Sequence, residues 1–373
     1  MEFRIEKNVF LSGLGLAQGV ADRKSTMPLL ANVLLRTEGK DRLLLAATDL
    51  NVTVTSELAA TVVREGGLTL GAKHLHDIIR SLPGEELQLK RAENQYAEIK
   101  AGKVEYRMVG MADRDFPKLP DHREVSFSEI DSAVFRDLVG KTFFSISTDE
   151  TRYHLNGVLV ECDGKGEKAR ARMVSTDGHR LSKVERTLAG GPEIRPGVII
   201  PRKGLVELRR ALEGVAGTVG LGFHHGHVFV RHGRTVVSVK LIEAQFPPYE
   251  QVIPKDQEKV VVVPRFALLD ALKRISLMSS DKTWGVRIGV DKGLLKISSD
   301  NPDLGEAREE LDAEYEGAPL TVGFNARYML DVLGEIDSDK VRLELAGELD
   351  PGVLRPDTDD DCDYLGVIMP MRI

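Results

Sequence analysis

Three stretches of this chain repeat the same order of elements, and this repeat constrains the fold more than any other feature. Each stretch has the pattern of an amphipathic helix, a pair of strands, a strand that enters a second helix, and a further strand. The clearest copies are the strand-into-helix segments LTLGAKHLHDIIRSL, VIIPRKGLVELRRAL and LTVGFNARYMLDVL. An acidic residue recurs inside their helices, at Asp77, Glu207 and Asp331, with spacings of 130 and 124 residues. Such a period indicates one structural unit used three times.

The first helix of each stretch is predicted from apolar side chains at helical spacing. In the middle stretch Arg136 and Lys141 face away from the apolar side, and in the last stretch Lys273 and Arg274 do so. A weaker version covers residues 9–20, where glycines interrupt the pattern. The apolar positions are Phe135, Leu138, Val139, Thr142, Phe143 and Ile146, then Leu268, Ala271, Leu272 and Ile275.

Strand pairs follow each first helix as β-rich runs separated by turns. They are MPLLANVLL and LLLAATDLNVTV, then RYHLNGVLV and ARMVSTDGHRLSKV, then WGVRIGV and LLKISSDNP. Polar, proline-containing stretches at 120–124 and 254–258 are typical of linkers. We therefore predict an α+β chain of three similar domains, at residues 1–124, 125–256 and 257–373. Three unrelated α+β domains that look alike by chance are the alternative.

The net charge limits how this chain can meet nucleic acid. It is −7 at pH 7, whereas a protein that grips DNA with its whole surface is basic. Any DNA contact must therefore be a local basic stripe. The two cysteines form no CxxC pair, which suggests a reducing compartment. No apolar run approaches the roughly 18 residues of a membrane span, and the N-terminus lacks a secretion-signal pattern. We expect a cytoplasmic protein without membrane contact.

One motif invites an enzymatic interpretation. In TDGHR, Asp177 could orient His179 as the general base of a hydrolase. Triad chemistry also needs an activated nucleophile, and no GxSxG-like signature occurs. A turn at Asp177-Gly178 between two strands is a simpler interpretation. The hydrolase remains the alternative hypothesis, ranked behind a non-enzymatic binding protein.

Metal and nucleotide sites are not expected. His224, His225, His227 and His232 flank a glycine turn on alternating strands, so their side chains need not converge on a metal ion. The segment SGLGLAQG nearly matches GxGxxG, but Gln18 occupies the position of the third glycine. We therefore expect no metal and no cofactor.

Longer segments match a known family, in order, from the first residues to the last. They include STMPLLANVLL, RDFPKLP, TRYHLNGVLVE, STDGHRLSKVE, KLIEAQFPPYEQVIPK, NPDLGEAREELD and the terminal VIMPMRI. These resemble the beta subunit of bacterial DNA polymerase III. The resemblance implies three DNA-clamp domains per chain and a head-to-tail homodimer, a closed ring with helices lining the hole and sheets outside.

The same resemblance implies a sliding clamp, a processivity factor that encircles double-stranded DNA without sequence preference. A clamp loader would place the ring, which would then tether the replicative DNA polymerase and other proteins with a clamp-binding motif. Phosphate contacts without base contacts suit such sliding.

Basic residues in the predicted helices are the candidates for these phosphate contacts. Arg202 and Lys203 are prominent among them, and the others are Lys73, Arg80, Lys141, Arg209, Arg210, Lys273, Arg274 and Arg327. By resemblance, Lys24, Lys73, Tyr153 and His154 match DNA contacts of the family. His154 stands where the family commonly has a phenol, and Asp149 where it commonly has a neutral polar residue, so Asp149 is left without an assigned contact.

The resemblance also implies a cleft for partner peptides and a dimer interface. Apolar residues would form the cleft floor and Arg180 would fix polar atoms of the peptide. The implied cleft residues are Leu155, Thr176, Gly178, His179, Arg180, Leu181, Pro247, Val252, Asn325, Tyr328, Val367, Ile368, Met369, Pro370, Met371 and Arg372. In the implied dimer, Tyr106 and Met108 of one chain meet Leu277 and Met278 of the other. Glu306 and Glu309 would face basic residues such as Lys73 or Arg107.

Overall fold

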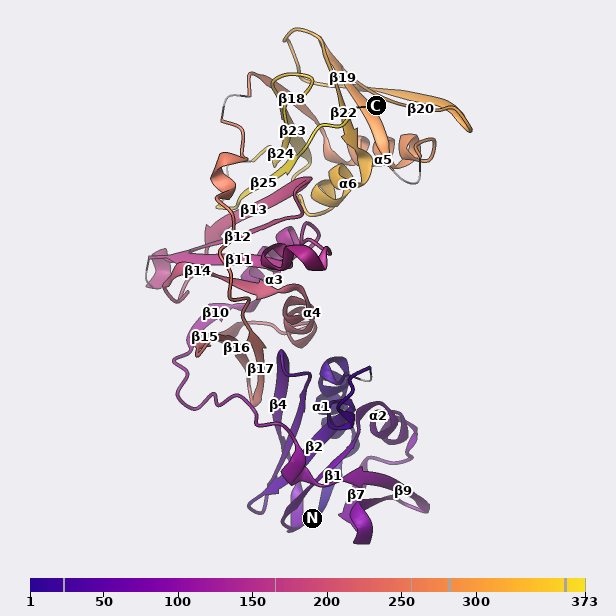
Figure 1. Ribbon diagram of the computed structural model, residues 1–373, viewed down its shortest axis with the longest axis vertical. Coiled ribbons are helices and arrows are strands. Elements are labelled where there is room, and N and C mark those ends of the chain that lie inside the picture. The colour runs from indigo at the N-terminus through magenta and orange to yellow at the C-terminus, as the bar shows by residue number, and fades with distance from the viewer. Residues whose placement is uncertain (23, 165, 256, 281–282, 359–360, 373) are drawn as a thin grey trace. The chain divides into compact units, whose positions relative to one another are not determined.

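The structure, a computed structural model, describes residues 1–22, 24–164, 166–255, 257–280, 283–358 and 361–372. Its internal contacts divide the chain into two compact units. The first unit comprises Met1–Ala133 and Lys203–Leu241, and the second comprises Val134–Arg202 and Ile242–Ile373. Each unit is described separately below (Figure 1).

The predicted repeat is present as an element order that occurs three times: strand, helix, three strands, strand, helix, three strands. The first copy, with β5 as an addition, contains β1 (Glu2–Glu6), α1 (Lys7–Val20), β2 (Asn32–Glu38), β3 (Arg42–Thr48), β4 (Val52–Ala59), β5 (Thr61–Arg64), β6 (Gly66–Gly71), α2 (Ala72–Ser81), β7 (Glu86–Arg91), β8 (Tyr96–Ala101) and β9 (Val104–Met111). The second copy contains β10 (Ser128–Asp131), α3 (Ser132–Phe143), β11 (Gly157–Asp163), β12 (Arg170–Thr176), β13 (Arg180–Thr187), β14 (Ile194–Pro201), α4 (Arg202–Ala211), β15 (Thr218–His224), β16 (His227–His232) and β17 (Thr235–Lys240). The third contains β18 (Lys259–Pro264), α5 (Arg265–Ser276), β19 (Gly285–Asp291), β20 (Leu294–Asn301), β21 (Gly305–Asp312), β22 (Leu320–Asn325), α6 (Ala326–Gly334), β23 (Lys340–Leu345), β24 (Gly352–Pro356) and β25 (Asp363–Ile368).

Three antiparallel sheets join these strands. In the first unit a single sheet has the order β10-β15-β16-β17-β4-β3-β2-β6-β9-β8-β7-β1-β5. In the second unit one sheet has the order β14-β11-β12-β13-β25-β24-β23-β18 and another β21-β20-β19-β22. Each compact unit therefore takes half of the middle copy, because those halves belong to different continuous sheets.

Two of the strand pairings join one copy of the repeat to the next, and they are equivalent. Strand β4 of the first copy pairs with β17 of the second, with Thr53 opposite Ser238. Strand β13 of the second copy pairs with β25 of the third, with Leu181 opposite Val367. In both cases the third strand after a first helix meets the last strand of the following copy.

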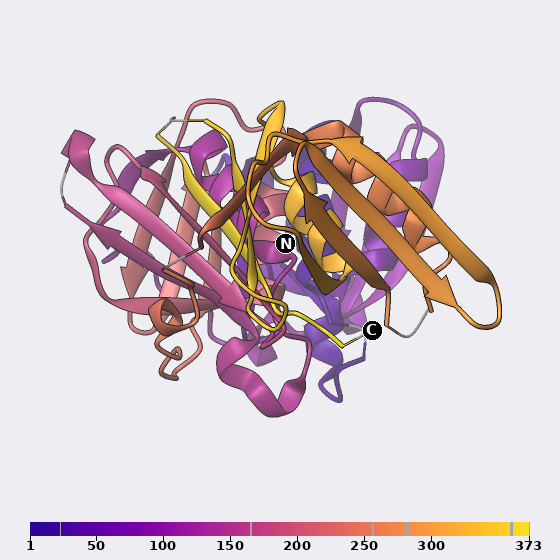
Figure 2. The same cartoon turned by 90° about the horizontal axis from the view of Figure 1, so that it is seen from above.

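Apolar helix faces pack on the sheets as the helical spacing predicts. Helix α1 buries Phe10, Leu14, Ala17 and Val20 and packs against α2, which lies beside it in Figure 1. In the second unit α5 packs across β20 and β21, the long orange strands of Figure 2. The glycine-containing segment 12–19 lies within α1, so it forms a helix and not a phosphate-binding loop.

Two local expectations from the sequence are wrong. Residues 152–155 do not extend β11 but form part of a short 3-10 segment, Glu150–Leu155. The cause is Asp149, whose carboxylate accepts hydrogen bonds from the amide and hydroxyl of Thr151 and caps the turn. Lys141 does not face outward: it is 5% exposed, and its Nζ contacts Asp137 at 2.6 Å and Asp337 at 3.2 Å.

Neither described cysteine forms a disulfide. None of the described helices is both long and apolar enough to cross a lipid bilayer.

Candidate functional site

The Thr-Asp-Gly turn between β12 and β13 organises the candidate cleft in the second unit. The hydroxyl of Thr176 accepts the amide of Gly178 at 3.1 Å. The carboxylate of Asp177 accepts the amides of His179 at 2.9 Å and Arg180 at 3.0 Å. Gly178 has φ +89°, a left-handed conformation that suits glycine. Local hydrogen bonds therefore determine the turn, as the sequence predicts.

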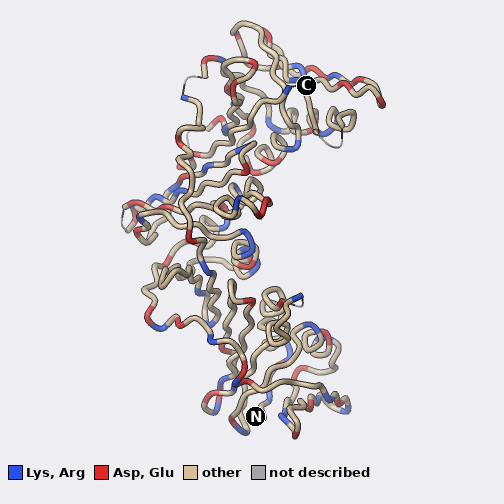
Figure 3. Tube along the Cα trace, in the orientation of Figure 1, with Lys and Arg blue, Asp and Glu red and all other residues tan. Residues whose placement is uncertain are grey.

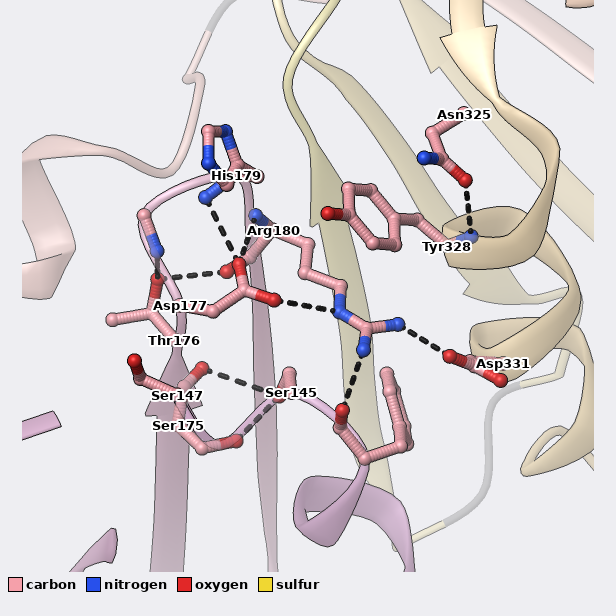
Figure 4. Close-up of polar contacts among 12 residues, drawn as sticks. Ser145, Ser147, Ser175, Thr176, Asp177, His179, Arg180, Asn325, Tyr328 and Asp331 are labelled. Atoms are coloured by element: carbon pink, nitrogen blue, oxygen red, sulfur yellow. Dashed lines mark hydrogen bonds and ion pairs between the residues drawn. The ribbon is translucent and has the colours of Figure 1, made fainter. Parts of the chain in front are cut away.

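Arg180 links this turn to the other wall of the cleft (Figure 4). Its guanidinium donates to Asp177 at 3.1 Å, to Asp331 at 2.5 Å and to the carbonyl of Phe144 at 2.6 Å. It also lies 4.4 Å from the ring centroid of Tyr328. The side chain is only 11% exposed. Arg180 therefore positions the walls, and its charge is already balanced by two carboxylates, which differs from the expected role of fixing peptide atoms.

The geometry does not support the hydrolase hypothesis. One oxygen of the Asp177 carboxylate accepts two backbone amides and the other accepts Arg180. The imidazole of His179 points away from that carboxylate in Figure 4. An aspartate that orients a catalytic histidine must hydrogen-bond to its ring, and this one does not.

The opposite wall is the start of α6. The side chain of Asn325 caps this helix by accepting the amides of Arg327 at 2.9 Å and Tyr328 at 3.3 Å. Its amide group donates to the carbonyl of Thr283 at 3.0 Å. Burial, with the charge of Asp177 as a smaller cause, raises the pKa of Tyr328, so its hydroxyl stays protonated and can donate to a ligand.

The cleft floor and the end of the chain meet at β25. Leu155, Leu181 and Val367 belong to one buried cluster, which also contains Phe246 and Tyr249. Val367 and Ile368 are 0% and 2% exposed, so both belong to the core beneath the chain end.

Beyond β25, backbone hydrogen bonds hold the chain end. The amide of Met369 donates to the carbonyl of His179, and that of Met371 to Gly323, both at 2.9 Å. Met369, Pro370 and Met371 are partly exposed, and Arg372 is exposed. Pro247 is partly exposed and Val252 is 38% exposed, on the segment that carries Phe246 and Tyr249. The predicted cleft residues thus lie at Leu155, in the Thr176–Leu181 turn, at residues 247–252, at the start of α6 and at the chain end, all within the second unit.

Two residues beside this cleft were missed at the sequence level. The guanidinium of Arg152 lies so near Gly178 that a Cβ there would meet it at 2.9 Å. Asp331 is the partner of Arg180, 151 residues away in sequence. The acid that recurs in every second helix was the available signal for Asp331, and nothing in the sequence singles out Arg152.

The predicted DNA contacts are distributed over both units. Lys24, Lys73 and Lys203 belong to the first unit and are exposed, but Lys203 forms an ion pair with the buried carboxylate of Asp49. The remaining three belong to the second unit: Tyr153 is 57% exposed, His154 is partly exposed, and Arg202 stacks 4.6 Å from the ring centroid of Phe143. Basic residues follow α4 in Figure 3.

The predicted dimer residues lie on β9, on β21 and directly after α5. Tyr106 and Met108 are on β9, where Tyr106 is 38% exposed. Leu277, directly after α5, is 77% exposed, and Met278 follows it. Glu306 and Glu309 are on β21, and Glu309 pairs with Arg274 of its own chain at 2.5 Å. Glu309 therefore already has a basic partner before any second chain is considered.

The histidine-rich segment forms a hairpin, as expected, with His224 opposite His227. Among the described residues no group of three or more potential ligands is arranged to hold a metal ion.

Comparison with known proteins covers the whole chain. Sequence profiles of the N-terminal, central and C-terminal domains of the DNA polymerase III beta subunit match residues 1–120, 129–248 and 250–372. The beta sliding clamp of Pseudomonas aeruginosa is 37% identical and that of Escherichia coli 32% identical, each over 100% of both chains.

Solved structures agree with the sequence profiles. The beta sliding clamp of Caulobacter crescentus superposes with a TM-score of 0.93 at 34% identity over 100% of both chains. A sliding clamp from Bartonella birtlesii bound to griselimycin superposes with a TM-score of 0.92 at 33% identity, also over 100% of both chains. The chain, with its three α+β clamp domains, therefore belongs to the bacterial DNA polymerase III beta subunit family, the beta sliding clamps.

Proposed function

We propose that two copies of this chain form a head-to-tail ring that encircles double-stranded DNA and acts as the processivity factor of a replicative polymerase. The observation that carries this proposal is a pair of equivalent strand pairings between copies of the repeat, β4 with β17 and β13 with β25. We call each such pairing a seam. By the same rule, the third strand of the last copy, β21, should meet the last strand of the first copy, β9. In the part of the chain that the structure describes, β21 borders only β20, and β9 meets β6 only at its end. A second chain would fill both free edges. A head-to-tail contact gives a closed ring when its rotation closes, and three copies per chain make two chains a natural ring.

The seams also predict the register of this interface. Within their own copies, Thr53 lies opposite Thr48 and Leu181 lies opposite Thr176. These two threonines are the first residues of the Thr-Asp turns. Ala307 pairs in the same way with Ser299, which precedes Asp300.

On the other side of the seam, Ser238 lies three residues after Thr235, the first residue of its strand. The equivalent of Ser238 in β9 is Arg107, three residues after Val104. Ala307 should therefore lie opposite Arg107 of the second chain, and Arg308 opposite Tyr106. This places Arg107 diagonal to Glu309, where the ion pair expected from the sequence can form.

We propose that the exposed basic helix residues, together with Lys24, Lys73, Tyr153, His154, Arg202 and Lys203, contact phosphates in the hole; the buried Lys141 is not among them. A net charge of −7 on the whole chain supports contacts confined to such a stripe. The three domains would comprise residues 1–124, 125–256 and 257–373. The ring would work in the cytoplasm, require no metal or nucleotide, and catalyse no reaction, because the ATP used for loading would be bound by the clamp loader.

We propose that polymerases, repair proteins and the loader dock a short peptide in the cleft formed by the Thr176–Leu181 turn, α6 and the chain end. Its partly exposed methionines support this role, since flexible and polarizable side chains suit several partners. Exposed Val252, buried Leu155 and Leu181, and protonated Tyr328 supply apolar and donor groups.

The decisive experiment combines mass in solution with retention on nicked circular DNA. A dimer that stays on the circle at high salt but leaves linear duplex supports a topological ring, because escape from a closed circle requires opening the ring. Equal loss from circular and linear DNA at high salt, or a monomer at micromolar concentration, would contradict it.

Deletion of residues 369–373 tests the cleft. Peptide binding should fall sharply while the dimer persists, because β9 and β21 are untouched. Unchanged peptide affinity in a well-folded truncated dimer would disprove this assignment.

A further inference from the structure

A groove in the first unit repeats the local geometry of the cleft. The hydroxyl of Thr48 accepts the amide of Leu50 at 3.0 Å, as Thr176 accepts Gly178. The carboxylate of Asp49 accepts the amides of Asn51 at 2.9 Å and Val52 at 2.6 Å, as Asp177 does one copy later.

The neighbouring segments repeat as well. The amide of Lys240 donates to the carbonyl of Asn51 at 2.7 Å, in the same relation as Met369 to His179. A Phe-Pro pair occurs in the segment beside each site: Phe116-Pro117 directly before Lys118 at the groove, and Phe246-Pro247 in the segment that carries Val252 at the cleft. Beside the Thr-Asp turn lies a cavity of about 520 Å³, within the range of ligand-binding pockets.

Two residues at this groove are held in an unfavourable backbone conformation. Leu50 takes the place of Gly178, has φ +75° and is 53% exposed. His225, at the tip of the β15–β16 hairpin, has φ +45°. Left-handed backbone is costly for residues other than glycine, and such strain gathers at functional sites. An exposed leucine that is also strained therefore points to a ligand.

The groove has an apolar floor and a rim with basic groups. Buried Phe229 and partly exposed Leu119 line the floor beside Leu50, and Lys118, His224, His225 and His227 line the rim. Of the two acids on the rim, Asp121 is held by Arg123 at 2.5 Å, whereas Glu124 reaches only 3.9 Å from His224. Lys118 has no acidic partner within ion-pair distance among the described residues. The buried Val52 stands at the position of Arg180, and none of the described residues that line this groove is an arginine.

We propose that this groove, formed by residues 48–53, 118–124 and 224–229, is a second docking site of the ring. Its occupant is an extended peptide that places an apolar side chain against Leu50, Leu119 and Phe229 and a carboxylate beside Lys118 and the histidines. The comparison with the cleft rests on the proposed function, but the strain, the cavity and the charge do not.

Fluorescence anisotropy with a short labelled peptide of alternating leucine and aspartate tests the proposal, in wild type and in the dimer lacking residues 369–373. The truncated dimer should bind one peptide per chain. Leu50→Gly and Lys118→Glu should each weaken that binding at least about fivefold. Matched controls, Leu349→Gly and Lys292→Glu, alter an exposed leucine and an exposed lysine of the second unit and should change nothing. A peptide of alternating leucine and lysine should bind at least about tenfold more weakly.

Leu50→Gly also separates lost binding from lost folding. Glycine relieves the left-handed strain, so the melting temperature should stay equal or rise while peptide binding falls. No saturable binding to the folded truncated dimer, or binding that neither groove variant changes, overturns the proposal. If the peptide binds the wild type but not the truncated dimer, the result supports the cleft as its binding site and contradicts the groove. Binding that survives truncation and depends on Leu50 supports the groove even if the cleft assignment fails.

Discussion

Replacing Arg180 by alanine should destabilise the second unit more than any exposed charge substitution. The variant leaves the carboxylates of Asp177 and Asp331 without their shared cation and the carbonyl of Phe144 without its donor. It also removes the stacking on Tyr328.

The expected cost follows from burial of the group. Removing one partner of a buried ion pair costs about 3–5 kcal/mol. Asp177 and Asp331 retain exposures of 18% and 33%, which places the loss at the lower end. A loss of about 3 kcal/mol lowers the melting temperature of a folding unit of this size by about 6–12 °C.

Differential scanning calorimetry of the purified dimer measures this shift. Lys292→Ala is the matched control, because its ion pair with Glu316 has exposures of 74% and 77% and should contribute about 0–1 kcal/mol. A double-mutant cycle with Asp331→Ala should give a coupling energy of about 1–3 kcal/mol. If Arg180→Ala shifts the melting temperature no further than Lys292→Ala, the central role of this arginine is refuted.

Three further outcomes are expected. Leu277→Asp should convert the proposed dimer to a monomer in light scattering, because burial worth about 1.5–3 kcal/mol is lost at each of two interfaces. The monomer should stay folded by circular dichroism, since Leu277 is 77% exposed within its own chain; an intact dimer would contradict the interface. Burial raises the pKa of Glu207, so its folded form favours the proton, and the stability it contributes is present at low pH and lost as pH rises. Glu207→Gln should therefore raise the melting temperature at pH 7.5 and flatten its pH dependence. A lower melting temperature would show that the charged carboxylate stabilises the fold. Burial, with Asp163 as a smaller cause, raises the pKa of the Cys162 thiol to about 11, so this contribution to stability is lost as pH rises towards that value. Iodoacetamide at pH 8.5 should modify Cys162 only after unfolding, and mass spectrometry that finds rapid labelling of the native protein would refute this.

Short-range patterns in the sequence determined the repeat, the order of its elements and the chemistry of the Thr-Asp-Gly turn. Each depends on residues a few positions apart: helical spacing in α5, alternation in β7, and a threonine and an aspartate that bond to the next amides. The same local rules predicted the turn at Asp177-Gly178 without any catalytic role. Family resemblance then supplied the cleft and the dimer interface as residue sets.

Only the tertiary structure decided which strands meet and which charges are buried. Pairing of β4 with β17 joins segments about 180 residues apart, and no local pattern encodes that choice. Lys141 has the helical position of an outward-facing residue, yet it is buried, and its ammonium group donates a hydrogen bond to Asp337, 196 residues away in sequence. The left-handed backbone of Leu50 likewise follows from the turn that Asp49 closes by accepting the amides of Asn51 and Val52. Side-chain periodicity specifies a face of each element, whereas the partner of that face is determined by packing across the whole chain.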